Sequence, residues 1–173
     1  DLDENINNYL PFNVSHPDYP DINITVRMLL SHRSSINGVL LTLPGITKYI
    51  LQEPPEEDEL GDWLKERASP EGAEFDENFW LEEKPGTKVT YSSAAHVLLV
   101  YLFKMITNES IESYCYDHIF EPLEMYNTSF HREDLNEDRV VTPYITKLGF
   151  IHIPIEVRDY KALAPVGGVL STT

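Results

Sequence analysis

The stretch KPGTKVTYSSAAH, residues 84–96, reads as a turn, a short strand and the start of a helix. Pro85-Gly86 is typical of a turn, and residues 88–91 suit a strand because they are partly β-branched or aromatic. Ser92 and Ser93 are both good N-cap residues, so a helix is expected to begin there. The stretch therefore places the phenol of Tyr91 beside the unpaired N–H groups of a helix N-terminus, which favour an oxyanion.

Helical spacing continues from this start through the middle of the chain. Small or apolar side chains recur on nearly every turn of residues 93–107, which predicts a helix central to the fold, ended by Asn108. A second helix is expected over residues 110–120, ended by Pro122. Its single cysteine, Cys115, is expected to be a buried and inert thiol.

The remaining segments predict short elements. A short helix is expected over residues 2–10 and another over 25–31, while residues 39–52 are ambiguous. Residues 141–157 alternate in places and contain Gly149, which predicts a hairpin, and residues 159–165 are expected to be a connection. The expected fold class is therefore mainly α with a small β-hairpin, in a single helical subdomain over residues 1–173.

Composition limits the function classes. The chain has 173 residues, of which 42% are hydrophobic and 11% aromatic, which is enough for one folded domain with a core. The net charge of -16 argues against nucleic-acid binding, because phosphate recognition depends on Lys and Arg. No apolar run approaches the roughly 20 residues that span a bilayer.

Residues 53–83 form an acidic excursion, rich in Glu and Asp and interrupted by three prolines. We interpret it as a solvated loop with a short helix around residues 59–67; a negative rim that repels anionic substrates or collects cations is the alternative. Four aromatic residues are expected to hold it to the body: Trp63, Phe75, Phe79 and Trp80. Neither the acids nor the histidines show metal-ligand spacing, so no metal or cofactor is expected.

Five ordered blocks resemble the serine β-lactamase and penicillin-binding-protein family, and most closely its class C branch with related carboxypeptidases and esterases. The blocks are residues 1–11, 24–35, 85–94, 119–130 and 165–172, the third resembling the family's "PG…YSN" and the fourth its "iFePLGMxxTsF". The resemblance implies the helical part of a β-lactamase/transpeptidase-like fold, lacking most of its sheet. It also implies a small-molecule or peptide substrate and an extracytoplasmic or cell-envelope location.

The departures from the family are informative. Its nucleophile is the serine of a Ser-x-x-Lys motif, which is absent from residues 1–173. We therefore expect an internal fragment of a longer enzyme, inactive by itself. Ser93 stands where the family has Asn, and it offers one hydroxyl in place of a carbonyl and an NH₂. Ser35 and Glu124 stand where the family has Gly, so a positive φ at Glu124 would strain the backbone.

The resemblance implies roles for four residues. Tyr91 would be the general base for the serine that forms the acyl-enzyme, and Ser93, Gly167 and Gly168 would bind substrate. Without the resemblance, Tyr91 would staple the helix start by packing, and Gly167-Gly168 would be an ordinary turn.

Two histidines are also considered: His32 follows the helix predicted over residues 25–31, and His96 lies in the first turn of the helix predicted over residues 93–107. His32 is expected to hydrogen-bond locally at the end of the helix over residues 25–31. His96 is close enough in sequence to approach Tyr91, but a packing role is the preferred interpretation.

Two alternatives to an enzyme stay open. One is a non-catalytic relative that keeps the same fold as a binding or scaffolding module. The other is an unrelated helical interaction module, which requires the five ordered blocks to be coincidence. The substrate and the oligomeric state stay undetermined.

Overall fold

The computed structural model describes residues 1–38, 55–56, 58–75, 77–154 and 161–171. They divide into two units, Asp1–Ile111 and Glu112–Thr173, and each is described by itself. The expectation of a single helical subdomain over residues 1–173 stays a prediction. Residues 39–52, ambiguous in sequence, lie outside the described part.

Helix α4, Ser93–Thr107, organises the first unit and has the bounds predicted from the sequence. The Ser92 hydroxyl accepts the Ala95 N–H at 3.1 Å and caps the start. Asn108 ends the helix with a left-handed φ of 56°. The buried side chains of α4 are Ala95, Val97, Leu98, Tyr101 and Leu102.

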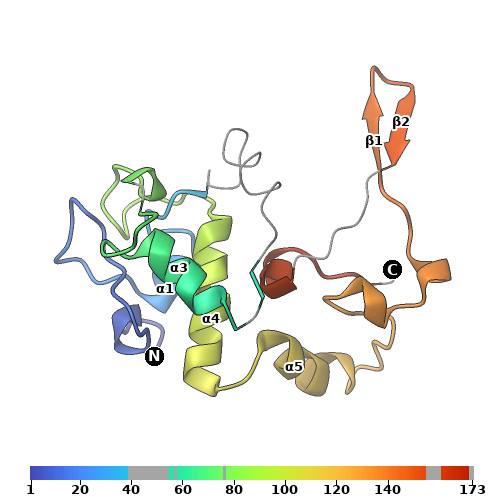
Figure 1. Cartoon of the computed structure of the whole chain (residues 1–173), viewed down its shortest axis with the longest axis horizontal. Helices are drawn as coiled ribbons and strands as arrows, with labels where there is room; N and C mark the ends of the chain where they lie inside the picture. The colour runs from blue at the N-terminus through green and yellow to red at the C-terminus, as the bar shows by residue number, and fades with distance from the viewer. Residues whose placement is uncertain (39–54, 57, 76, 155–160, 172–173) are drawn as a thin grey trace. The chain divides into compact units, whose positions relative to one another are not determined.

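Two shorter helices pack against α4 in this unit (Figure 1): α1, Val26–Leu30, and α3, Leu60–Ala68. Both were predicted, α3 as the short helix of the acidic excursion. Leu29 of α1 and Leu60, Leu64 and Ala68 of α3 are buried, so apolar contacts hold the excursion to the body. Of the four aromatic residues expected to do this, Phe79 and Trp80 are buried and Trp63 and Phe75 are partly exposed.

The helix predicted over residues 2–10 is wrong, since only a 3-10 turn, η1, Ile6–Asn8, forms there. Asparagine side chains here hydrogen-bond to backbone N–H groups, which competes with the hydrogen bonds of a helix. Asn5 Oδ1 accepts the Asn7 N–H at 3.0 Å, and Asn7 Oδ1 accepts the Val14 N–H at 2.9 Å.

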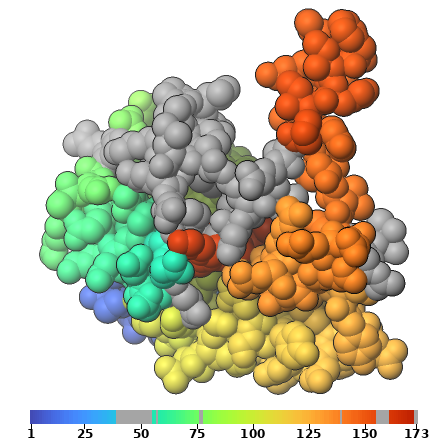
Figure 2. All heavy atoms as spheres, turned by 45° about the vertical axis from the view of Figure 1, so that its right-hand side comes forward, coloured from blue at the N-terminus to red at the C-terminus, as the bar shows by residue number. Residues whose placement is uncertain are grey.

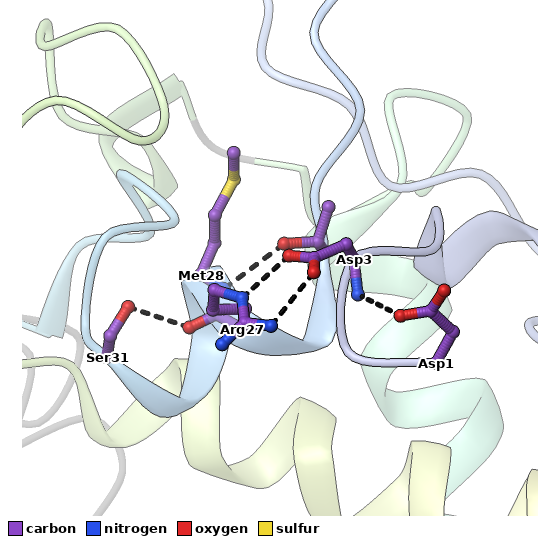
Figure 3. A network of polar contacts seen from close by, with 6 residues as sticks. Asp1, Asp3, Arg27, Met28 and Ser31 are labelled. Carbon is purple, nitrogen blue, oxygen red and sulfur yellow. Dashed lines mark hydrogen bonds and ion pairs between the residues drawn. The ribbon is translucent and has the colours of Figure 1, made fainter.

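The N-terminal segment is joined to α1 by a two-bond ion pair (Figure 3). Arg27 donates from Nε and Nη2 to the two carboxylate oxygens of Asp3 at 2.6 and 2.8 Å, and the Asp3 N–H donates to Asp1 Oδ1 at 3.0 Å. The hydrogen bond from Arg27 lowers the pKa of the Asp3 carboxyl. Both side chains are exposed to solvent, so the pair contributes little to stability.

The helix predicted over residues 110–120 is present, in two forms. α5, Ile111–Cys115, is followed by a π-helical turn, η4, Tyr116–Phe120. Cys115 is half-buried, so the prediction of a buried thiol is wrong in degree. Burial nevertheless raises the pKa of that thiol, which disfavours the reactive thiolate.

A hairpin forms within residues 141–157, as predicted. β1, Tyr144–Lys147, pairs antiparallel with β2, Ile151–Pro154, with Ile145 opposite Ile153. Leu148 and Gly149 in the turn both have positive φ. All eight strand residues are exposed, and the hairpin stands out from the rest of its own unit (Figure 2).

The second unit also contains three 3-10 turns: η5, Arg132–Asp134, η6, Glu137–Arg139, and η7, Lys161–Val166. A further turn of this kind, η3, Glu77–Phe79, belongs to the first unit. A connection was predicted over residues 159–165; residues 159–160 lie outside the described part, and η7 forms over the rest. In the described part of the chain, no helix is long and apolar enough to cross a membrane.

Candidate active site

Tyr91 lies at the end of an extended segment that follows a turn and leads into α4. Gly86 turns the chain with a φ of 89°, as predicted. The strand predicted over residues 88–91 is wrong, because this segment joins no sheet among the described residues. Its backbone bonds instead to the loop after α1: the Thr90 N–H donates to the His32 carbonyl at 2.8 Å.

The loop over residues 32–38 runs along this segment and fixes it at several points. The Gly86 N–H donates to the Arg33 carbonyl at 2.7 Å, and the Leu81 N–H donates to the Ser35 carbonyl at 2.8 Å. The Ser35 hydroxyl donates back to the Glu83 carbonyl at 2.5 Å. The extended run that carries Tyr91 is therefore held to another loop by backbone hydrogen bonds.

Gly38 lies close to the backbone of Tyr91 and Ser92. A Cβ placed on Gly38 would lie 2.4 Å from the Tyr91 carbonyl oxygen and 2.8 Å from Ser92 Cα, both backbone atoms. Only glycine leaves room for that approach. Gly38 was not among the predicted site residues. Its place a few residues after a helix end was the only feature of the sequence that could have pointed to it.

The Tyr91 phenol is accessible, since the residue is 67% exposed. The Ser93 hydroxyl donates to the phenolic oxygen at 3.3 Å. Ser92, between them, is fully buried and caps α4. The two predicted site residues of the first unit are thus side by side at the N-terminus of the longest described helix.

His32 hydrogen-bonds locally at the end of α1, as predicted, through its backbone N–H to the Leu29 carbonyl at 3.2 Å, but its side chain has a distant partner. Its Nδ1 accepts the N–H of Ser92, 60 residues away, at 3.2 Å. Its ring centroid lies 4.7 Å from that of Tyr91 and 4.7 Å from that of His96. Burial, and secondarily the positive charge of His96, lower the pKa of His32, so the neutral imidazole is favoured.

His96 packs beside the site, as preferred in the sequence analysis. Its Nδ1 lies 3.1 Å from the Ser92 carbonyl oxygen. A carbonyl can only accept a hydrogen bond, so this ring nitrogen carries the proton. Its ring is tilted by 40° against the ring of His32.

Gly167 and Gly168 belong to the second unit. Their N–H groups donate to the Ala164 carbonyl at 3.2 and 2.7 Å, which ends η7 in a tight turn. Leu170 then pairs with Ser129 through two backbone hydrogen bonds. These hydrogen bonds support a turn at the two glycines. Their substrate-binding role stays a prediction.

No group of three or more His, Cys, Asp or Glu is arranged for a metal ion within the residues that the structure describes. The chemistry available at Tyr91 is that of an accessible phenol and a neighbouring hydroxyl at a helix N-terminus, which favours negative charge. That combination suits proton transfer to or from a bound hydroxyl.

Comparison with known proteins identifies the family. The family model described as "Beta-lactamase" matches residues 1–173. The chain belongs to the beta-lactamase family. The ordered blocks in the sequence are therefore family motifs, and an unrelated helical module is ruled out.

The chain is similar to several proteins of this family. The chain is 28% identical, over 102 residues, to the "Putative D-alanyl-D-alanine carboxypeptidase" of Escherichia coli (strain K12). The match covers 51% of this chain and 24% of that protein. The chain is also similar to the octameric penicillin-binding protein homologue of Pyrococcus abyssi, with a TM-score of 0.73 and 22% identity over 99% of this chain and 36% of the other. The D-amino acid amidase of Ochrobactrum anthropi SV3 gives a TM-score of 0.66 and 21% identity over 99% and 45%.

The fold is β-lactamase/transpeptidase-like, with helices and a two-stranded antiparallel sheet among the described residues. The chain spans about a quarter of the length of the curated relatives it matches and less than half of these solved structures.

Proposed function

We propose that this chain is part of a serine acyl-hydrolase that resembles class C β-lactamases and penicillin-binding proteins, with Tyr91 as general base. The observation behind the proposal is the placement of an accessible phenol at the start of a capped helix, in a member of this family. Residues 1–173 would supply the helical part of the fold, and most of the sheet would come from elsewhere in the protein.

The reaction assigned to the whole protein is acyl transfer to a serine, followed by hydrolysis. Tyr91 would take the proton of the serine hydroxyl as the serine attacks an ester or amide carbonyl. A phenol has a pKa near ~10, so it works as a base at neutral pH only where its anion is stabilised. A helix N-terminus favours negative charge, and the Ser93 hydroxyl donates to the phenolic oxygen at 3.3 Å.

A lysine of the expected Ser-x-x-Lys motif would supply the larger part of the positive field. Residues 1–173 contain no such motif, so the chain by itself is proposed to be inactive. Ser93, Gly167 and Gly168 are proposed to bind substrate. The names of the relatives, a carboxypeptidase and a D-amino acid amidase, favour an amide substrate.

The test is the Tyr91→Phe variant of the full-length protein, with Tyr126→Phe as its matched control. Tyr126 is 72% exposed in the second unit and has no proposed role. Single-turnover acylation by a chromogenic cephalosporin and by a nitrophenyl ester should fall about 10²–10⁴-fold in Tyr91→Phe, which is the usual value of a general base. It should be unchanged in Tyr126→Phe.

Unchanged acylation in Tyr91→Phe would remove Tyr91 from the mechanism. The non-catalytic alternative makes a different prediction: the unaltered full-length protein would form no covalent adduct with a fluorescent penicillin or a fluorophosphonate. Turnover of either substrate by residues 1–173 alone would contradict the proposed inactivity of this piece.

A further inference from the structure

His32 contacts the chain on both sides of Tyr91. Its backbone carbonyl accepts the Thr90 N–H at 2.8 Å, and its side-chain Nδ1 accepts the Ser92 N–H at 3.2 Å. Thr90 and Ser92 are the neighbours of Tyr91 in sequence. Any residue at position 32 offers the first bond, but the second requires a side-chain acceptor at the place of the imidazole nitrogen.

The backbone of His32 indicates that the side chain matters. The His32 N–H donates to the Leu29 carbonyl at 3.2 Å, and the Arg33 N–H donates to the Met28 carbonyl at 2.7 Å. These two bonds are the Schellman motif that ends α1, and His32 occupies its left-handed position with a φ of 55°. Glycine is the usual residue there because it carries no Cβ penalty.

The tautomers of both histidines follow from their partners. An N–H can only donate, so the Ser92 N–H requires a lone pair on His32 Nδ1, which leaves the proton of the neutral ring on Nε2. The Ser92 carbonyl requires the opposite arrangement in His96, with the proton on Nδ1. The backbone of the buried Ser92 is therefore held at its N–H by one ring and at its carbonyl by the other.

The His32 ring also supports the phenol directly. Its centroid lies 4.7 Å from that of Tyr91, at a tilt of 45°. The other titratable group beside it is His96, and the neighbouring Arg33 points its guanidinium at the Gly86 carbonyl, 3.4 Å away. Protonation of His32 would replace its acceptor by a donor facing the Ser92 N–H, which removes the bond.

We infer that His32 is the positioning residue of Tyr91: its neutral Nε2–H tautomer fixes the Ser92 peptide and its ring supports the phenol. The placement of Tyr91 is read from structure alone, while its effect on acylation rests on the proposed function.

Two variants separate the side chain from the backbone. His32→Gly tolerates the left-handed φ and removes the acceptor. His32→Asn also tolerates that φ, and its carbonyl oxygen can take the place of Nδ1. Both should leave the end of α1 intact, so a difference between them reports the hydrogen bond to Ser92.

The first measurement is NMR of the full-length protein labelled with ¹⁵N in histidine and serine. The His32 signal, assigned by its loss in the variants, should show an unprotonated Nδ1 and a protonated Nε2, with the reverse in His96. Exchange of the Ser92 amide should be about five- to tenfold faster in His32→Gly and near the unaltered rate in His32→Asn. An Nδ1–H tautomer at His32, or equal Ser92 exchange in all three proteins, overturns the inference.

The second measurement is acylation of the same proteins. His32→Gly should lower the single-turnover rate about 10- to 100-fold with little change in substrate affinity, and His32→Asn should restore most of it. If the NMR results hold and Tyr91→Phe acylates normally, the proposed function fails and the positioning of Tyr91 stands. If Tyr91→Phe is impaired and His32→Gly acylates normally, His32 is not a positioning residue.

Discussion

Gly38→Ala should displace the candidate base without touching its side chain. The added Cβ would lie 2.4 Å from the Tyr91 carbonyl oxygen, and ordinary contact begins at 3.4 Å, so one of the two backbones must move by about 1 Å. Overpacking of this kind costs roughly 1–3 kcal/mol of unfolding free energy. A 1 Å misplacement of a catalytic group costs about 100-fold in rate.

Two assays on the full-length protein test this reasoning. Urea unfolding should show a lower midpoint for Gly38→Ala, and single-turnover acylation should be slower even at temperatures where the variant is fully folded. Gly167→Ala is the control for stability, because a Cβ there meets nothing within 4 Å, and its unfolding free energy should stay within about 0.5 kcal/mol of that of the unaltered protein. A Gly38→Ala protein with normal stability and normal acylation would show that the close approach at Tyr91 does not constrain the site.

Three further outcomes are expected. Ser92→Ala should lower the unfolding free energy by about 1 kcal/mol in urea, because a buried helix cap is lost; an unchanged midpoint would mean that the cap is dispensable. The pKa of His32 is below its usual value of 6.5 in the folded state, so the unfolded chain binds the proton first and stability should fall as pH drops from about 6.5 through the folded-state pKa. Urea midpoints between pH 8 and 5 should show a shallower loss in His32→Asn, and parallel curves would contradict this. Glu124→Gly should raise the thermal midpoint by relieving a left-handed φ, whereas Ser35→Gly should not, because it also removes a hydrogen bond to the Glu83 carbonyl; equal gains in both would refute the distinction.

The sequence predicted the elements that depend on neighbouring residues. α4 begins and ends where its cap residues indicated, because Ser92 and Asn108 act within one turn of the helix. The hairpin was found from its alternation and from Gly149, which has the positive φ that the turn requires. Position 124 has the left-handed φ anticipated from the glycine of the family motif.

The parts that the sequence could not predict depend on partners far along the chain. The extended run at Tyr91 looked like a strand, since its residue types suit one, but its hydrogen bonds go to a loop about 60 residues earlier. His32 makes the local bond that was predicted, but the sequence gives no sign that its side chain accepts the Ser92 N–H, 60 residues away. A propensity describes the preference of a residue for a backbone shape and does not identify the partner that satisfies its N–H and C=O groups.

The left-handed positions connect these observations to the candidate site. His32 and Ser35 both hold a φ that glycine would adopt more easily. The Ser35 side chain bonds to Glu83, before Tyr91, and the His32 side chain bonds to Ser92, just after it. Such strain persists where the surrounding contacts offset it. In the loop after α1, the backbone strain at His32 and Ser35 is therefore offset by two side-chain hydrogen bonds, to Glu83 and to Ser92. The two bonds lie on either side of Tyr91 in the sequence, and Tyr91 itself is exposed. Restraint of the backbone around an exposed side chain is the arrangement expected when the position of that side chain matters more than local stability.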